Sequence, residues 1–535
     1  MLALALGIGI FSYTLFALGL LGLFNIPVFI FLLFTFLIFS IVLILKYGLI
    51  EKMKLIAIYI FTSKSNLLKL LISFLAAMLL INFIIALSPE RGFDALWYHL
   101  MIPKLYVQNH GVFYIPGSLL YYSPMPKLLD LLYIIPIGLH LDFLTRLISL
   151  SFGILTLFTT YYFAKIFVRR SLAILVPVIL FSNIVFSWQM TTAYIDIGRT
   201  FFEILSIFTL FLWMQNKKQS LFIESALCMG LAIATKPISF ISLFSILFFI
   251  AFYGLRSENP KKVAKQIVVF FLSAVIVPLP WLIFSLTNTG SPFYPFFTKI
   301  YEISPSASLL NPLVFVSEVF KIFTTSPDPI SPLFIIILPL LVICFKKFNS
   351  KERLLLLYCI LSLLAWYVTP RTGGGRFMLV YLPVFSILVA IILKHIQDRI
   401  IYRFVFGLVL FFAFIAFTAR LYVGYKVAPV VFGFESKDEF LSRHLNFEYG
   451  DFYDTDRELA KLIGDSDMVL IYGGHNLYYV NFPFIHESWI KKGDVFNYIL
   501  TQDTELPNDF YFFKLVYENK KTHVNLYSGE GFWKY

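Results

Sequence analysis

The chain has 535 residues and a net charge of +12, with 59% hydrophobic and only 14% charged residues. A soluble domain carries roughly 25% charged residues, so the composition excludes a string of soluble domains. The Lys and Arg residues gather in short loops between apolar runs, which is typical of the cytoplasmic side of a membrane protein. We therefore interpret the charge as a topology signal and expect no nucleic-acid partner.

Apolar runs of about 20 residues recur as far as Tyr425 and predict an all-α polytopic membrane protein. We expect about thirteen spans, at 2–24, 26–46, 66–87, 143–166, 171–189, 195–214, 220–236, 238–254, 266–286, 331–345, 353–369, 376–393 and 404–424. The chain starts without a basic segment or a cleavage site, so the first run is expected to be a retained span that begins in the cytoplasm. The segment 127–140 is apolar but short, and we expect an interfacial or half-buried helix there.

Threading these spans in order brings the remaining polar stretches to one outer face. They are the loops 88–142 and 287–330, the link 369–376, the turn before Asp196 and the tail. The loop 287–330 is rich in Pro and Ser, and it predicts neither a sheet nor one long helix.

The tail differs from the rest because a helix-like stretch, DTDRELAKLIGD, precedes strand-like runs such as DMVLIYGG and THVNLYS. This order predicts a small α/β domain on the outer face. The expected organisation is two N-terminal transmembrane helices in 1–65, a transmembrane catalytic module in 66–425 and an extracytoplasmic domain in 426–535.

Asp94 lies just outside the third expected span, beside Trp97 and Tyr98. A partly desolvated carboxylate at a membrane boundary suits a base or an ion ligand. Aspartate is also a favoured N-cap, so the alternative is that Asp94 caps a helix over Ala95–Ile102. His99 follows in the same stretch, but no close spacing of ligands predicts a zinc site.

Asp196, Arg199 and Glu203 share one face of the expected sixth span. Ionisable groups inside a span are costly and are functional candidates for that reason. The alternative for Arg199 and Glu203 is a buried pair that only holds helices together. Two carboxylates such as Asp94 and Asp196 could also bind a divalent cation, so metal dependence stays open.

Arg371 and Arg376 flank three glycines at an outer membrane edge. Glycines allow the backbone to approach a ligand, and guanidinium groups bind phosphate oxygens in pairs. Lys104 and Lys236 are further candidates for such a phosphate site, and ordinary interfacial anchoring is the alternative for all four. The sequence contains no Walker loop, dinucleotide fingerprint or GxSxG motif, which disfavours ATP hydrolysis and serine-esterase chemistry.

These motifs resemble the GT-C class of membrane glycosyltransferases, in particular the protein O-mannosyltransferases and lipid A aminoarabinose transferases. The resemblance covers roughly 66–395 and rests on an order of motifs: FDALWYHLMIPKLY, SPMPKLLDLLY, AYIDIG, GLAIATKP and GGGRFMLVYLP. It does not extend to the first two spans or to the tail. The usual acidic pair of the first loop is replaced by Asp94-Ala95, which leaves Asp94 to act alone or with Asp196.

The resemblance implies an enzyme that takes a sugar from a polyprenyl-phosphate carrier and passes it to a lipid, glycan or protein acceptor. Asp94 and Asp196 would be its acidic residues, and Arg376, with Arg371 as a neighbour, would hold the carrier phosphate. Tyr98 and His99 are possible substrate contacts, as are Arg199 and Glu203. Single displacement with an aspartate base would invert the anomeric centre.

Two other classes remain open from the sequence. An O-antigen ligase or polymerase also uses polyprenyl carriers, but it does not predict an acidic residue in the first outer loop and another at the start of a later span. A transporter or flippase predicts internal repeats and broken helices that meet at mid-membrane. We find no clear repeat, and the polar residues gather at one face.

Overall fold

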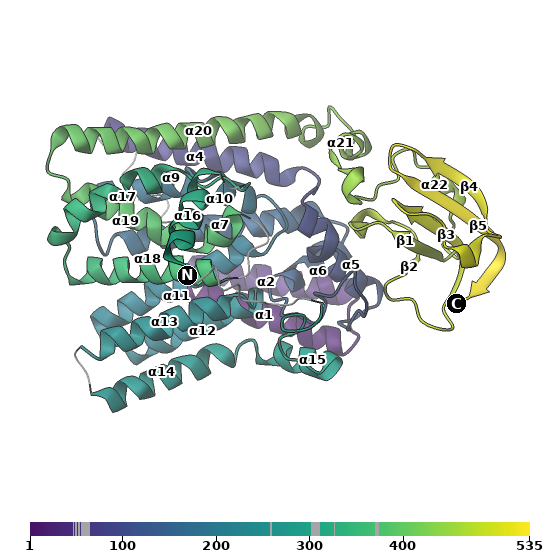
Figure 1. Cartoon of the computed structure of the whole chain (residues 1–535), viewed down its shortest axis with the longest axis horizontal. Coiled ribbons are helices and arrows are strands. Elements are labelled where there is room, and N and C mark those ends of the chain that lie inside the picture. Colours follow the sequence, from purple (N-terminus) through teal and green to yellow (C-terminus); the bar gives the residue numbers. More distant parts are fainter. Residues whose placement is uncertain are drawn as a thin grey trace.

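The chain folds into a bundle of long helices with a small β-sheet domain at one end (Figure 1). The computed structural model describes residues 1–46, 48, 51, 54, 62, 65–256, 259–300, 311–325, 327–369 and 374–535. The longer helices of the bundle are α1 (Leu2–Leu20), α2 (Ile26–Lys46), α4 (Asn66–Leu87), α7 (Phe143–Ala164), α11 (Asp196–Asn216), α12 (Gln219–Thr235), α13 (Ser239–Gly254), α14 (Pro260–Val275), α15 (Leu279–Thr289), α16 (Pro312–Thr324), α17 (Leu333–Cys344), α18 (Ser350–Val368), α19 (Leu382–His395) and α20 (Arg399–Val431). Helix α11 is central and packs against α7 and α12.

Seven helices within the described residues are long and apolar enough to cross a membrane, or eight if the bent pair α14 and α15 forms one span. Several of them expose apolar side chains as lipid-facing helices do; on α2, Phe31 is 68% and Phe34 64% exposed. The expected multi-pass, mostly helical membrane protein is confirmed. The count of thirteen spans stays a prediction, because helices such as α12 and α13 fall below 18 residues.

The segment 171–189 is not the single continuous helix expected of a span: it forms three short helices, α8 (Arg170–Ala173), α9 (Leu175–Phe181) and α10 (Ile184–Gln189). Pro177 has no N–H to donate to the turn before it, which ends α8. Asn183 has an extended backbone between α9 and α10. Its Nδ2 donates to the carbonyl oxygens of Ile179 and Leu180, so the end of α9 is satisfied by a side chain.

Prolines also bend the span expected over 266–286. The axes of α14 and α15 differ by 63° across the break. Pro278 and Pro280 lie at this break, where each removes a backbone donor and crowds the preceding turn. A continuous apolar run in the sequence therefore corresponds to two helices of different direction.

One loop expectation needs correction, and another loop contains a short helix that is compatible with its expectation. The segment 127–140 forms a 3₁₀ turn (Asp130–Tyr133) and α6 (Ile134–Gly138), and its apolar residues are buried in the protein rather than lying at an interface. The loop 287–330 contains the helix α16, which begins where Asn311 accepts from the N–H of Leu313 and Pro312 occupies the first turn.

The tail forms a five-stranded mixed sheet with the order β2-β1-β3-β5-β4. Its strands are β1 (Val469–Gly473), β2 (Phe484–His486), β3 (Val495–Gln502), β4 (Lys514–Asn519) and β5 (Val524–Lys534). Strand β1 is parallel to β2 and β3, and β5 is antiparallel to β3 and β4. The expected small domain is confirmed, but β3 was missed, and the helix expected from DTDRELAKLIGD is only the turn α22 (Leu459–Leu462). A longer helix, α21 (Lys437–His444), precedes it.

The sheet domain packs on the loop 88–142. The hydroxyl of Tyr479 donates to the carbonyl of Glu90 at 2.7 Å. Gly117 has φ +94°, and a Cβ there would lie 1.8 Å from the carbonyl oxygen of Ser488. Only glycine fits this close approach. The loop that carries Asp94 is therefore covered by the last part of the chain.

Candidate active site

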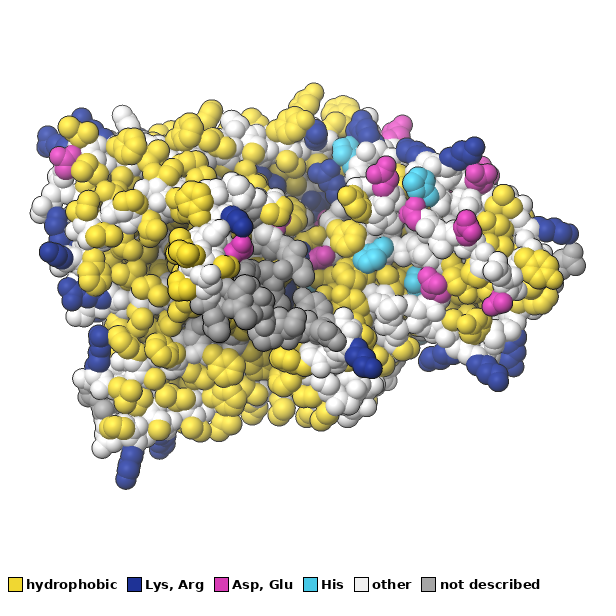
Figure 2. All heavy atoms as spheres, viewed as in Figure 1, with side chains coloured by type: hydrophobic (Ala, Val, Ile, Leu, Met, Phe, Trp, Pro, Cys, Tyr) yellow, Lys and Arg dark blue, Asp and Glu magenta, His cyan; other side chains and the backbone are white. Residues whose placement is uncertain are grey.

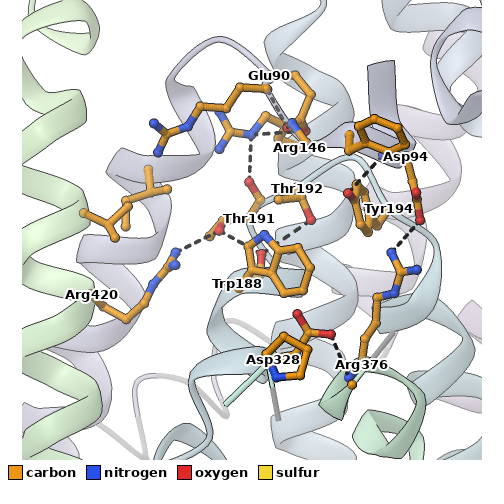
Figure 3. A pocket seen from close by; sticks show the side chains of 17 residues that line it. Glu90, Asp94, Arg146, Trp188, Thr191, Thr192, Tyr194, Asp328, Arg376 and Arg420 are labelled. Atoms are coloured by element: carbon orange, nitrogen blue, oxygen red, sulfur yellow. Dashed lines mark hydrogen bonds and ion pairs between the residues drawn. The ribbon is translucent and has the colours of Figure 1, made fainter. Parts of the chain in front are cut away.

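Asp94 lies in the loop after α4, and its carboxylate faces an arginine from a distant part of the chain (Figure 3). Nη1 of Arg376 donates to Oδ2 of Asp94 at 2.5 Å, and the N–H of Asp94 donates to the hydroxyl of Tyr194 at 3.1 Å. The interpretation of Asp94 as a cap for a helix over Ala95–Ile102 is wrong. That segment starts as a π-helical turn (Ala95–His99), and the Asp94 side chain makes no capping hydrogen bond.

Arg376 is held in place from several sides. It lies on a 3₁₀ segment (Gly375–Tyr381) that leads into α19. Its guanidinium group lies 5.3 Å from the ring centre of Tyr194, and the backbone N–H of Arg376 donates to Oδ2 of Asp328 at 3.3 Å. Burial raises the pKa of Asp328, and the bond from Arg376 opposes this shift. The expected partner Arg371 lies outside the described residues.

A second ion pair adjoins the first. Nζ of Lys236 lies 2.6 Å from Oδ1 of Asp196, which joins the end of α12 to the start of α11. The charges of Asp196 and Arg376 are close enough to interact. Asp94, Arg376, Asp196 and Lys236 thus form an alternating set of charges, here called the charge cluster. All four were expected site residues, and the fold brings them together.

The Asp94–Arg376 pair forms part of the wall of two cavities. The larger cavity, of about 510 Å³, is called the arginine cavity because Arg91, Arg146 and Arg420 also line it. The smaller, of about 140 Å³, is called the aromatic cavity. Its lining includes Lys236 and the side chains Trp97, Tyr98, His99, Tyr122, Phe296 and Phe377. Two separate ligands could therefore approach the same carboxylate.

Glu90 and Arg146 hold the loop of Asp94, and neither was singled out from the sequence. Oε1 of Glu90 accepts from the N–H groups of Arg91 and Gly92, and Oε2 accepts from the N–H of Ala193. Arg146 donates to the carbonyl oxygens of Ser88, Pro89 and Thr191. Figure 3 shows the two side chains next to each other, near Thr192.

Arg420 on α20 was also missed. It is 4% exposed, and it donates to Oδ1 of Asn82 at 3.0 Å and to the hydroxyl of Thr191 at 2.8 Å. Within the described part of the chain it has no carboxylate partner in ion-pair range. A charged residue inside an expected span is a functional candidate, and this signal was present for both Arg146 and Arg420.

Arg199 and Glu203 belong to the bundle interior rather than to the cavities. Nε of Arg199 lies 2.7 Å from Oε1 of Glu203, which also accepts from the hydroxyl of Ser239. Neither side chain lines the two cavities described above. This geometry favours the interpretation of a pair that holds helices together.

Lys104, on α5 (Met101–Gln108), is not part of the charge cluster. Its Nζ donates to the carbonyl oxygen of Tyr478 at 2.8 Å and to that of Val480. The ammonium group of Lys104 already donates hydrogen bonds to carbonyl groups of the sheet domain. The structure therefore does not support the expected contact of Lys104 with a carrier phosphate.

The contacts of Lys104 lead to a pH prediction. Burial lowers the pKa of Lys104 from its ordinary value of 10.5 to about 8. Between these two pH values, Lys104 binds more protons in the unfolded chain than in the folded chain. The contribution of Lys104 to the free energy of unfolding therefore rises with pH. We expect the melting temperature of the wild type to rise relative to that of Lys104→Met between pH 7.5 and 9.5. A difference that is constant over this range would contradict the prediction.

The described residues contain no group of three or more His, Cys, Asp or Glu side chains arranged to hold a metal ion. Asp94 and Asp196 each face a cationic side chain instead.

Comparison with solved structures shows that this chain shares its fold with ArnT. ArnT from Cupriavidus metallidurans in the apo state matches with a TM-score of 0.59 and 13% identity, over 87% of this chain and 98% of that chain. The same protein bound to undecaprenyl phosphate matches with a TM-score of 0.53 and 13% identity, over 85% and 97%. No family model matches the sequence, and no curated protein matches it. The expected GT-C fold is confirmed.

Proposed function

We propose that this chain is an integral-membrane glycosyltransferase that moves a sugar from a polyprenyl-phosphate carrier to an acceptor on the extracytoplasmic face. The observation that carries the proposal is the Asp94–Arg376 pair in the wall shared by two cavities. A carboxylate can accept a proton there, next to a guanidinium group that can bind a phosphate. The carrier class is supported by the similar fold of ArnT, which has been captured with undecaprenyl phosphate.

In this mechanism Arg376 and Lys236 bind the carrier phosphate. The phosphate competes with Asp94 for Arg376 and thereby releases the carboxylate. Asp94 accepts the proton of the acceptor hydroxyl or amine while the acceptor atom attacks the anomeric carbon. The bond from this carbon to the phosphate oxygen breaks, and polyprenyl phosphate leaves with its new charge stabilised by the two cations. One displacement inverts the anomeric centre, and Asp196 keeps Lys236 in position.

The two cavities suggest where each substrate lies. The aromatic cavity contains both phosphate-binding cations and suits the carrier-linked sugar, because apolar walls with a few polar groups are typical of small-ligand sites. The arginine cavity is larger and suits the acceptor. Asp94 lies between them, where a base that serves the acceptor must be.

The distribution of charge supports the orientation in the cell (inner or plasma) membrane. Lys and Arg residues gather at the end of the bundle opposite the sheet domain, and a broad hydrophobic surface separates the two ends (Figure 2). The helices α14, α18 and α20 begin at this basic end (Figure 1). Met1 and Lys165 line one surface hollow, so the N-terminus lies near a basic loop. By the positive-inside rule this end is cytoplasmic, and the tail 426–535 is extracytoplasmic.

A transfer assay tests the proposal. Membranes with and without the chain are supplied with a radiolabelled pool of polyprenyl-phosphate sugars, and label in carrier and acceptor fractions is counted. We expect label to reach an acceptor only where the chain is present. Label that crosses the bilayer without forming a new bond would indicate a transporter instead. Transfer of whole carrier-linked glycans would indicate a ligase or polymerase.

A further inference from the structure

His99 is held by a buried carboxylate and leaves one ring nitrogen unused. The side chain is about 1% exposed, and its Nδ1 lies 2.9 Å from Oδ1 of Asp130. The other oxygen of Asp130 lies 3.7 Å from Nζ of Lys127. Nε2 of His99 is buried and has no hydrogen-bond partner among the described residues. A buried polar atom without a partner costs stability, so its retention points to a ligand.

The contact with Asp130 sets the role of the free nitrogen. A carboxylate paired with a lysine only accepts hydrogen bonds, so the hydrogen of the neutral imidazole lies on Nδ1. Nε2 then presents a lone pair. It can accept a hydrogen bond from a hydroxyl group, but not from a phosphate oxygen that carries no hydrogen.

His99 lines the aromatic cavity together with Asp94, Lys236 and Arg376. The volume of about 140 Å³ is roughly ten times the ~10–15 Å³ that one water needs, which leaves room for a group the size of a sugar ring. Aromatic side chains such as Tyr98 and Tyr122 give this space flat apolar walls. A carrier phosphate at Lys236 and Arg376 would bring its sugar into the same space.

We infer that His99 is a substrate-binding residue whose Nε2 accepts a hydrogen bond from a hydroxyl group of the transferred sugar, with Asp130 holding the imidazole in the accepting tautomer. This inference rests on the proposed function and adds a residue that selects the donor. Asp94 remains the base for the acceptor, so the two groups serve different substrates. A site built to bond a hydroxyl rejects ligands that lack one, which makes His99 a determinant of sugar choice.

The test uses the full chain in the transfer assay described above. His99→Phe keeps a ring but removes the acceptor atom, and we expect kcat/KM for the carrier-linked sugar to fall on the order of 100-fold, mainly through a higher KM. His99→Gln offers an amide oxygen in place of Nε2, and we expect it to retain much more of the wild-type value. His444→Phe makes the same chemical change on α21 in the sheet domain and serves as the matched control. All variants are compared at equal membrane levels and with their melting temperatures.

The possible outcomes separate this inference from the proposed function. If the wild type transfers no sugar, the proposed function fails and the inference fails with it. If the wild type and His99→Phe transfer equally well, only the inference is overturned. A loss in kcat with an unchanged KM for the carrier-linked sugar would also overturn it. Should His99→Phe not accumulate, His99→Leu, which has no hydrogen-bonding atom in its side chain, is compared with His99→Gln in its place.

Discussion

Replacing Asp94 by Asn is expected to lower kcat for sugar transfer by about 10²–10⁴-fold, the usual contribution of a general base. The amide has nearly the same size and its oxygen still accepts from Arg376, so the loop keeps its geometry. It cannot accept the proton of the acceptor. The measurement is the initial rate of label transfer at saturating carrier, with the amount of protein in each membrane preparation determined in parallel.

The matched control for this variant is Asp438→Asn. Asp438 also pairs with an arginine, Arg457, but in the sheet domain and with both side chains partly exposed. We expect this variant to transfer sugar at the wild-type rate. Equal rates for Asp94→Asn and the wild type would show that Asp94 is not the base. Asp196 would then be the candidate for the base.

Replacing Arg376 by Gln is expected to lower kcat by about 10²–10³-fold, as the loss of one donor to a developing charge does in other enzymes. Arg376→Lys keeps the charge but loses the planar fork that binds two phosphate oxygens, so we expect it to recover only part of the rate. The same assay measures kcat and the KM for the carrier-linked sugar in all three proteins. We expect kcat to fall in the order wild type, Arg376→Lys, Arg376→Gln.

Arg457→Gln breaks the exposed pair in the sheet domain and is the control for Arg376→Gln. The double variant Asp94→Asn, Arg376→Gln should lose less than the product of the two single losses, because both side chains act in one step. Losses that simply multiply would indicate that the two residues act independently. If Arg376→Gln transferred sugar faster than Arg376→Lys, this result would argue against phosphate binding by Arg376.

The membrane fold could be predicted from the sequence because apolar length and loop charge act locally. Breaks inside apolar runs could not, since they depend on single residues: Pro177 and Asn183 divide one expected span, and Pro278 with Pro280 bends another. Strand β3 was missed because it is paired on both sides by segments distant in sequence. Its pairing, rather than a local pattern, defines it.

The charge cluster was predictable in its members but not in its pairs. Asp94 and Arg376 are 282 residues apart, and no spacing in one sequence indicates that they meet. Arg199 and Glu203 were equally suggestive on one helix face, yet they bond to each other away from the cavities. Asp130 is polar in a short apolar segment, and its role became visible only where it contacts His99.

The contact between the first loop and the sheet domain has a consequence for biosynthesis. The loop is translated early, but Lys104 bonds to carbonyl groups of Tyr478 and Val480, and Gly117 lies against Ser488. A ribosome must therefore finish most of the chain before this loop gains its final contacts, and on the proposed topology the tail must also cross the membrane first. Nascent chains released before the sheet domain is translated would insert into the bilayer with the loop of Asp94 uncovered. The order of translation therefore delays completion of the site to the last stage of synthesis.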